Sequence, residues 1–163
     1  MGTVALLLAA LLTGGSLDAQ STTRRKSGLP DPPKKDIPYI IHAEQLLEVE
    51  TGEVKEETRK DEQLYVIPGA AATVKTPLAG PEFLFLSESI PPDKLQLYKL
   101  ESRSGRREVV VMRKKKPVAR PIRLTIFRIH EALFKIRVNE SLEPGQYSLS
   151  PDGSNAVFCF AVE

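Results

Sequence analysis

Three side chains of this sequence could carry nucleophilic or metal chemistry, and they lie far apart along the chain. Cys159 is the only cysteine, and His42 and His130 are the only histidines. A thiol nucleophile needs a neighbouring histidine that a third group orients, and a zinc site needs ligands at short regular spacing. The sequence shows neither a histidine near Cys159 nor the ligand spacing of a zinc site, so we expect no metal, no cofactor and no catalytic residue. We interpret Cys159 as a structural thiol, with an intermolecular disulfide, a redox sensor or a nucleophile as alternatives.

The short motifs of common enzyme classes are also missing from the sequence. It contains no phosphate-binding loop, no GxSxG or HExxH pattern, no dinucleotide-binding glycines and no calcium loop. Acidic residues gather between residues 44 and 62, but a glycosidase needs two carboxylates facing each other across a cleft. We therefore expect a protein that is not an enzyme, and a hydrolase of unrecognised type is the alternative.

The sharpest local feature is a run of basic side chains at the end of a predicted strand. Arg113, Lys114, Lys115 and Lys116 are consecutive, and Arg120 follows shortly after them. Such a group could bind the phosphate, sulfate or uronic acid groups of an anionic partner. Lysines at a sheet edge also prevent strand-to-strand aggregation, which is the structural alternative. No aromatic residues are interleaved with the run, so we do not expect a nucleic-acid partner.

Charge is strongly segregated along a chain whose net charge is only +2. Residues 44–62 contain eight acidic and three basic side chains, whereas residues 94–137 contain fourteen basic and three acidic ones. Either these segments neutralise each other within the fold, or the basic segment forms a face for an anionic envelope polymer or a protein partner.

Beyond residue 38 the apolar side chains recur with a period of two, which is typical of strands. About nine short strands, separated by frequent turn signals, predict one antiparallel β-sandwich over residues 38–163. Residues 82–87 indicate a strand buried on both faces. The clearest hairpin joins residues 95–101 to residues 107–113 through a five-residue connection that contains glycine.

The segment LEPGQY, residues 142–147, resembles the tyrosine corner of immunoglobulin-like and fibronectin type III-like sandwiches. The resemblance implies that Leu142, Pro144, Gly145 and Tyr147 form a structural corner where the chain crosses between sheets. It also implies that the tyrosine hydroxyl bonds back to the backbone of this corner. The fold implied is an immunoglobulin-like β-sandwich, and the resemblance implies nothing about function.

Residues 1–37 do not follow the strand pattern. Residues 4–12 form an apolar run too short for a bilayer, which needs about 20 residues, and typical of a secretory signal peptide. We expect a signal peptide over residues 1–19 with cleavage after Ala19, no membrane span, and a disordered arm rich in proline and basic residues over residues 20–37. An exported chain without a disulfide pair favours a bacterial periplasmic or secreted protein.

These observations favour a secreted or periplasmic, non-catalytic module with a binding or structural role at the cell envelope. The alternative is a subunit of a homo- or hetero-oligomeric envelope assembly, which would pair through strand edges or through Cys159. The sequence leaves the oligomeric state and the identity of the ligand open.

Overall fold

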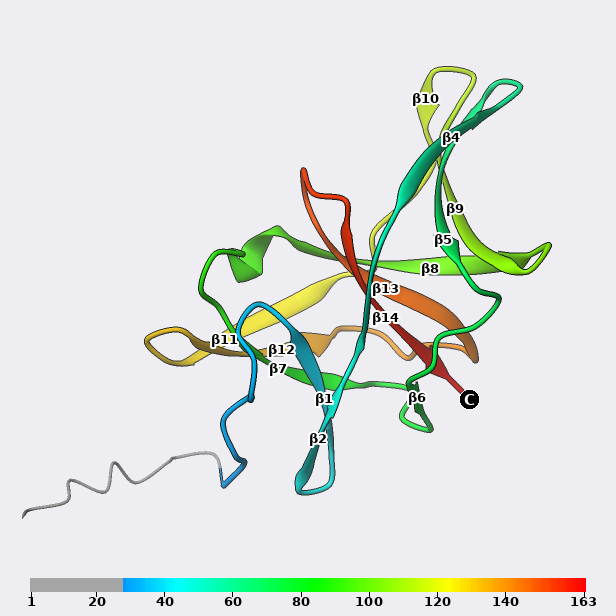
Figure 1. Ribbon diagram of the computed structural model, residues 1–163. Coiled ribbons are helices and arrows are strands. Elements are labelled where there is room, and N and C mark those ends of the chain that lie inside the picture. The colour runs from blue at the N-terminus through cyan, green and yellow to red at the C-terminus, as the bar shows by residue number, and fades with distance from the viewer. Residues whose placement is uncertain (1–27) are drawn as a thin grey trace, which may run out of the picture.

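The computed structural model describes residues 28–163, and β-strands supply nearly all of their regular structure. Within this range the exception is one short 3-10 turn, η1 (Pro92–Lys94). The strands form two sheets packed face to face, so the predicted all-β antiparallel sandwich is confirmed (Figure 1). The predicted signal peptide, residues 1–19, and residues 20–27 of the predicted arm lie outside the described residues.

The first sheet has five antiparallel strands, with the most apolar strand at its centre. Their order is β11 (Leu124–His130), β12 (Leu133–Val138), β7 (Glu82–Leu86), β1 (Pro38–His42) and β2 (Gln45–Glu48). Phe83, Leu84 and Phe85 of the central strand β7 are fully buried, which confirms the prediction of a strand covered on both faces.

The second sheet follows a longer path and carries two short additions. Its order is β3 (Glu50–Glu53), β14 (Ala156–Val162), β13 (Gly145–Pro151), β8 (Leu95–Arg103), β9 (Arg106–Arg113), β5 (Glu62–Pro68) and β4 (Lys55–Arg59). The two-residue strand β10 (Lys116–Pro117) pairs with β9, and β6 (Lys75–Thr76) lies parallel to β14.

The core between the sheets is built from aromatic side chains that alternate along their strands. Phe83 of β7 meets Phe160 of β14 edge to face, with ring centroids 5.3 Å apart. Tyr147 of β13 stacks on the same Phe160 ring at 5.6 Å. Such contacts add to the apolar burial of the rings, which makes this cluster the main link between the two layers.

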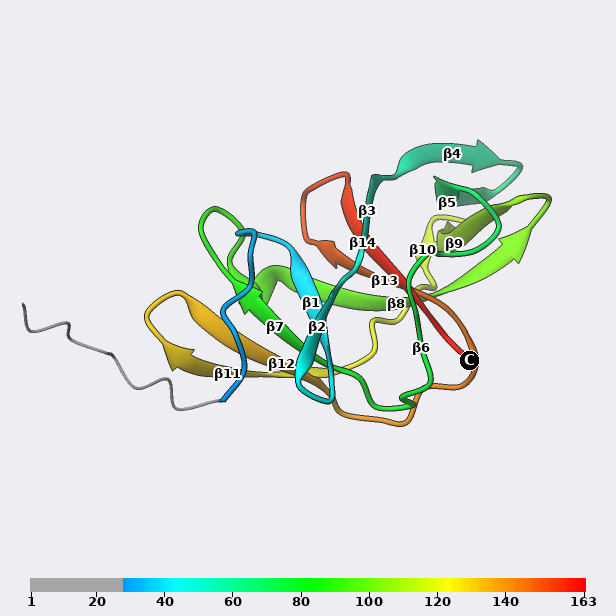
Figure 2. The same cartoon turned by 60° about the horizontal axis from the view of Figure 1, so that its bottom comes forward.

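The second sheet curls because β8 changes its partner along its length. Residues 95–100 of β8 pair with β13, whereas residues 101–103 pair with β9. At the far ends of the path, β3 and β4 are separated in sequence by Val54 alone. The two end strands of the sheet are therefore consecutive in the chain, and the β9–β5–β4 portion turns back over the outer face of β14 and β13 (Figures 1 and 2).

A second apolar cluster fills part of the space inside this curl. Its members come from three strands and one loop: Ile67, Ala72, Leu100, Val157, Cys159 and Ala161. Phe158, Phe160 and Val162 of β14 point into the main core, while the residues between them point into this second core. Both faces of β14 are thus buried.

Residues 142–147 have the hydrogen bond that their resemblance to a tyrosine corner implies. The Tyr147 hydroxyl donates to the Glu143 carbonyl at 2.7 Å, and the Tyr147 side chain is almost fully buried. Leu142 packs into the main core beside it. The bond satisfies a backbone carbonyl where the chain enters β13, while the immunoglobulin-like type of the sandwich stays a prediction.

Two boundaries differ from the sequence prediction. The β8–β9 hairpin has a two-residue turn, Ser104-Gly105, with φ of 52° and 76°, instead of a five-residue loop. Two left-handed residues match the twist of the flanking strands, so both strands continue up to the turn. The ordered chain also begins before Pro38: Pro32 is buried, and Ile37 packs against the main core.

Asp36 explains the second difference. Its carboxylate accepts the backbone N–H groups of Glu88 at 2.8 Å and Ile90 at 3.0 Å, and also that of Ser89. The Asp36 N–H donates to the Leu86 carbonyl at 2.8 Å. Composition predicts disorder for this segment because it offers no apolar face. A polar clamp holds it against the sandwich instead.

Candidate functional site

The structure separates the residues that could have formed a catalytic set. Cys159 lies in the second sheet with 1% of its surface exposed, and burial raises the pKa of its thiol to about 12. His42 and His130 belong to the first sheet, on strands that β7 and β12 separate. Within residues 28–163, no three His, Cys, Asp or Glu side chains lie close enough to hold a metal ion.

An ion pair between the buried Arg107 and the partly exposed Glu50 lies next to Cys159. Arg107 is 2% exposed, and its Nη2 donates to Glu50 Oε1 at 2.6 Å and to the Pro68 carbonyl at 2.8 Å. Its Nε donates to the Gly69 carbonyl at 3.0 Å. Glu50 is also the strand partner of Cys159. These bonds tie β3, β9 and the loop after β5 together, so the pair closes one end of the curled sheet.

The predicted basic site lies at the tip of a hairpin. Lys114 and Lys115 form the turn between β9 and β10, with φ of 48° and 61°. Arg113 and Lys116 flank this turn as register partners, and Arg120 lies beyond β10 in the irregular segment. Four of the five predicted residues therefore come together, and the fifth lies apart from the turn along the chain.

Acidic groups are interleaved with this basic tip. The Lys114 N–H donates to the Asp61 carbonyl at 2.8 Å, which places the tip beside the β4–β5 turn. Arg113 Nε donates to Glu62 Oε1 at 2.9 Å. Within the described chain, no ion pair engages Lys114, Lys115 or Lys116, and all three side chains are exposed.

The remaining charge segregation is largely cancelled by strand pairing. Four ion pairs join segment 94–137 to segment 44–62: Arg106 with Glu57, Arg107 with Glu50, Arg113 with Glu62, and, with the signs reversed, Glu108 with Arg59. Because β4, β5 and β9 are neighbours, their opposite charges face each other. The basic segment continues into β11 and β12 of the first sheet, so it forms no single basic face.

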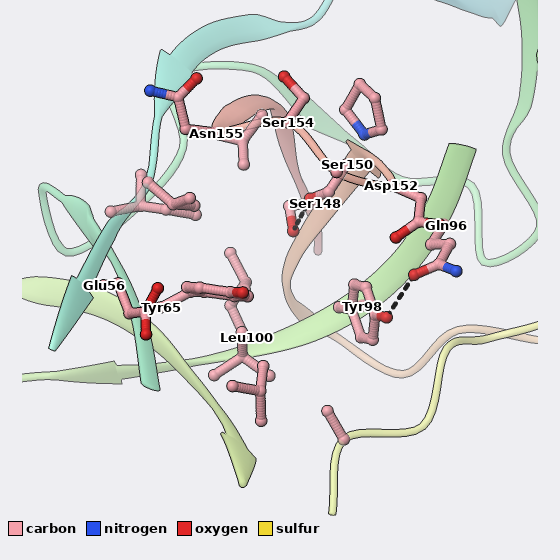
Figure 3. Close-up of a pocket in the computed structure, with 18 of the residues that line it drawn as sticks. Glu56, Tyr65, Gln96, Tyr98, Leu100, Ser148, Ser150, Asp152, Ser154 and Asn155 are labelled. Carbon is pink, nitrogen blue, oxygen red and sulfur yellow. Dashed lines mark hydrogen bonds between the residues drawn. The ribbon is translucent and has the colours of Figure 1, made fainter. Parts of the chain in front are cut away.

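An open cavity with a volume of about 530 Å³ lies inside the curled sheet, and polar groups from several strands converge on it (Figure 3). Its floor is shared with the second core through Ile67, Leu100 and Val157. Its rim is formed by the turn of residues 151–155 and by Pro117 and Ala119. One end of the curl is thus packed and the other end is open.

The strands that wrap the cavity place polar side chains around it. On β4 and β5, Glu56 and Tyr65 are register partners. On β8 and β13, Tyr98 lies opposite Ser148, and Gln96 lies opposite Ser150. The Tyr98 hydroxyl donates to Gln96 Oε1 at 2.6 Å, and burial is the main cause that raises the pKa of Tyr98.

Ser148 is the most deeply buried polar group of this lining. It is 2% exposed, yet its hydroxyl has only a 3.4 Å contact with the Ser150 hydroxyl. Hydroxyl hydrogen bonds normally measure about 2.5–3.0 Å. Buried hydroxyls almost always have a closer partner. The cavity therefore presents Ser148 with unused bonding capacity.

Sequence reasoning did not find this site. Gln96 and Tyr98, like Ser148 and Ser150, occupy the positions between inward apolar residues of their strands. In a simple sandwich these positions face solvent, so their pattern carries no sign of a cavity. The only available signal is the tyrosine among them, because large aromatic side chains on an open face often mark a contact surface.

Within the described residues, no helix is long and apolar enough to cross a membrane. In the comparisons with known proteins, no family model, no curated protein and no solved structure matches this chain.

Proposed function

We propose that this chain is a non-catalytic binding module whose small ligand occupies the cavity of the curled sheet. The observation that carries the proposal is the cavity itself, of about 530 Å³, with Tyr65, Tyr98 and Ser148 lining it. Ligand sites of proteins commonly measure about 300–1,000 Å³ and combine an apolar lining with a few converging polar groups.

The combination of polar and apolar groups in the cavity lining supports a ligand-binding site rather than an incidental surface depression. The floor is apolar through Leu100, Val109 and Val157, while hydroxyl, amide and carboxylate groups stand around it. A polar group turned into such a space loses solvation unless a partner bonds to it. A ligand that bonds to Ser148 and covers the apolar floor would satisfy both requirements at once.

Binding rather than catalysis is also supported by the composition of the lining. Within the described chain, the cavity is lined by neither histidine, cysteine nor lysine. Its serines therefore have no basic side chain beside them that could activate a hydroxyl as a nucleophile.

The first test is to fill the cavity. Ser150→Trp introduces a large side chain at the cavity wall, and Ser141→Trp makes the same change at an exposed loop position. Amide spectra would be recorded during titration with a panel of amines, neutral sugars and dicarboxylates. We expect at least one compound to shift the Tyr98 and Ser148 amides in the wild type and in Ser141→Trp, but not in Ser150→Trp. A panel that leaves these amides unmoved in the wild type contradicts the proposal.

A second candidate is the binding of an anionic polymer by the basic tip. The observation that favours it is the exposure of Lys114, Lys115 and Lys116, none of which has an ion-pair partner within the described chain. This site is independent of the cavity.

The setting of the module is part of the proposal. We infer export to the periplasm or the cell exterior from the apolar run of residues 4–12, and a binding or structural role at the envelope from that export. Expression with the native N-terminus should yield protein in the periplasmic or extracellular fraction with the mass of residues 20–163. Full-length protein retained in the cytoplasm contradicts this part.

A further inference from the structure

The ionisable side chains of the cavity all belong to acids or phenols. Among its lining residues in the described chain they are Glu56, Asp152, Tyr65 and Tyr98, and no lysine, arginine or histidine joins them. We propose that the cavity binds an aliphatic amine with a cationic group at each end, the class of diamines and polyamines. The inference rests on the proposed function and assigns its ligand class.

The two carboxylates stand at different sides of the opening, each near a tyrosine (Figure 3). Glu56 is the register partner of Tyr65 across β4 and β5. Asp152, in the turn after β13, acts electrostatically on Tyr98. A carboxylate attracts an ammonium group. The face of an aromatic ring attracts the same cation through its quadrupole. Each side of the opening therefore offers one place for a cationic group.

The space between the two carboxylates suits a hydrocarbon chain. Leu100, Val109 and Val157 line it with apolar side chains. Methylene groups gain free energy when they leave water for such a surface. A ligand with charge at both ends and methylenes between them therefore matches the order of groups along the cavity, whereas a compact metal ion or a uniformly polar sugar matches only part of it.

Hydrogen-bond acceptors with unused capacity lie on both sides of the cavity opening. Glu56 Oε1 accepts a bond from Gln63 Nε2, and within the described chain Glu56 Oε2 has no hydrogen-bond partner. The Tyr98 hydroxyl donates to Gln96, which leaves its oxygen free to accept an N–H bond. The buried Ser148 hydroxyl, with only a long contact to Ser150, is a third acceptor. An ammonium group has three donors and no acceptor, so it complements this set.

A matched series of six-carbon compounds tests the ligand class. The probes are hexamethylenediamine, hexylamine, hexanediol and adipate, which differ in end-group charge but share the length of the chain. Binding would be measured by calorimetry and by shifts of the Tyr98 and Ser148 amides. We expect hexamethylenediamine to bind most tightly, hexylamine more weakly, and the diol and adipate least. Added salt should lower the affinity of the protein for the diamine and leave its affinity for the diol unchanged.

Isosteric variants test the two carboxylates. Asp152→Asn and Glu56→Gln should each lower the affinity for hexamethylenediamine by about two- to fivefold, which is the range for the loss of a solvent-exposed ion pair. Glu44→Gln makes the same charge change in the exposed turn between β1 and β2, away from the cavity lining, and should have no effect. The affinity of hexanediol should be equal in all four proteins.

The outcomes separate this inference from the proposed function. If adipate, hexanediol or a sugar shifts the cavity amides more strongly than the diamine, the cavity is a binding site but the amine class is wrong. Diamine affinity that is equal in Asp152→Asn, Glu56→Gln and the wild type also overturns the amine assignment. If no compound shifts these amides, both proposals fail.

Discussion

At the scale of single residues, Cys159 is held as a neutral, inaccessible thiol. It is 1% exposed inside the second core, and burial raises its pKa to about 12 against the opposing effect of the Arg107 charge. Because only the thiolate is nucleophilic, we expect native protein at pH 8 to react with iodoacetamide far more slowly than protein unfolded in guanidinium chloride. Mass spectrometry gives the modified fraction.

The same burial bears on the proposed alternative of pairing through Cys159. A disulfide between two copies would first require the second core to open. The mass of the native protein by light scattering should therefore be the same with and without reductant. Rapid native labelling, or a dimer that reductant dissolves, would contradict the structural interpretation of this thiol.

The ion pair between the buried Arg107 and the partly exposed Glu50 gives the second prediction at this scale. Removing one partner of a buried ion pair leaves the other charge uncompensated, at a typical cost of about 3 kcal/mol. We expect Glu50→Gln to lower the free energy of unfolding by roughly that amount in denaturant titrations at pH 7. Glu143→Gln, which removes an exposed partner of Lys99, is the matched control and should leave stability unchanged.

The pair also predicts a pH dependence. Burial by itself would raise the pKa of Glu50, but the Thr73 N–H and Arg107 outweigh it and lower the pKa below its ordinary value of 4.5. The folded state therefore favours the carboxylate, and this contribution is present above pH 4.5 and lost as pH falls through the lowered pKa. Glu50→Gln should show a flatter loss of stability on acidification. An equally steep loss would contradict the assignment.

At the scale of elements, Asp36 fastens the segment before β1 to the loop after β7. Burial favours a raised pKa, but the hydroxyl of Ser89 and three backbone N–H groups outweigh it and lower the pKa of Asp36. We expect Asp36→Ala to reduce the free energy of unfolding by about 2 kcal/mol, in the range for hydrogen bonds to a charged group. It should also speed tryptic cleavage after Lys34 and Lys35.

Asp36→Asn separates the contribution of the carboxylate's hydrogen bonds to stability from that of the backbone conformation at this position. Asp36 has φ of 58°, a conformation that asparagine tolerates better than alanine does. The asparagine variant keeps the backbone preference and one acceptor oxygen, so it should lie between the wild type and Asp36→Ala. If all three proteins are cleaved at the same rate, the clamp does not hold this segment.

At the scale of the whole molecule, charge is distributed so that the cavity and the basic tip differ in sign. The cavity lining carries Glu56 and Asp152 without a basic side chain, whereas Lys114 and Lys115 form the β9–β10 turn and Lys116 follows them at the start of β10. Opposite local potentials favour different partners for the two regions. A cationic ligand in the cavity and an anionic polymer at the tip are therefore compatible.

The tip can be tested with dextran sulfate as the polyanion. We expect replacement of Lys114, Lys115 and Lys116 by alanine to abolish a binding that rising salt weakens. Replacing Lys34, Lys35 and Lys75, which are exposed and paired with acids, gives the same change in net charge. If both triple variants lose binding equally, the effect comes from net charge, and the tip is not a specific site.

Local patterns were sufficient to predict much of the fold. The apolar side chains recur with a period of two residues, and this pattern predicted strands because a strand turns successive side chains to opposite faces. The burial of β7 also followed from its own apolar residues, and the resemblance of residues 142–147 to a tyrosine corner implied the Tyr147 hydrogen bond. In each case the physical cause acts within one strand or one turn, so no knowledge of distant partners was needed.

The tertiary structure alone decided the cavity and the partners of the charged strands. The curl arises because β8 exchanges β13 for β9, and because Val54 joins the two end strands. These local connections close the sheet only because β8 pairs with β13, β9 with β5 and β14 with β3, and these pairings join residues far apart in the sequence that no local pattern encodes. The alternation that places Tyr98 and Ser148 opposite the main core is the same whether that face meets water or another part of the sheet. The sequence determined which side chains share a face, and the closure of the sheet determined that this face lines a site.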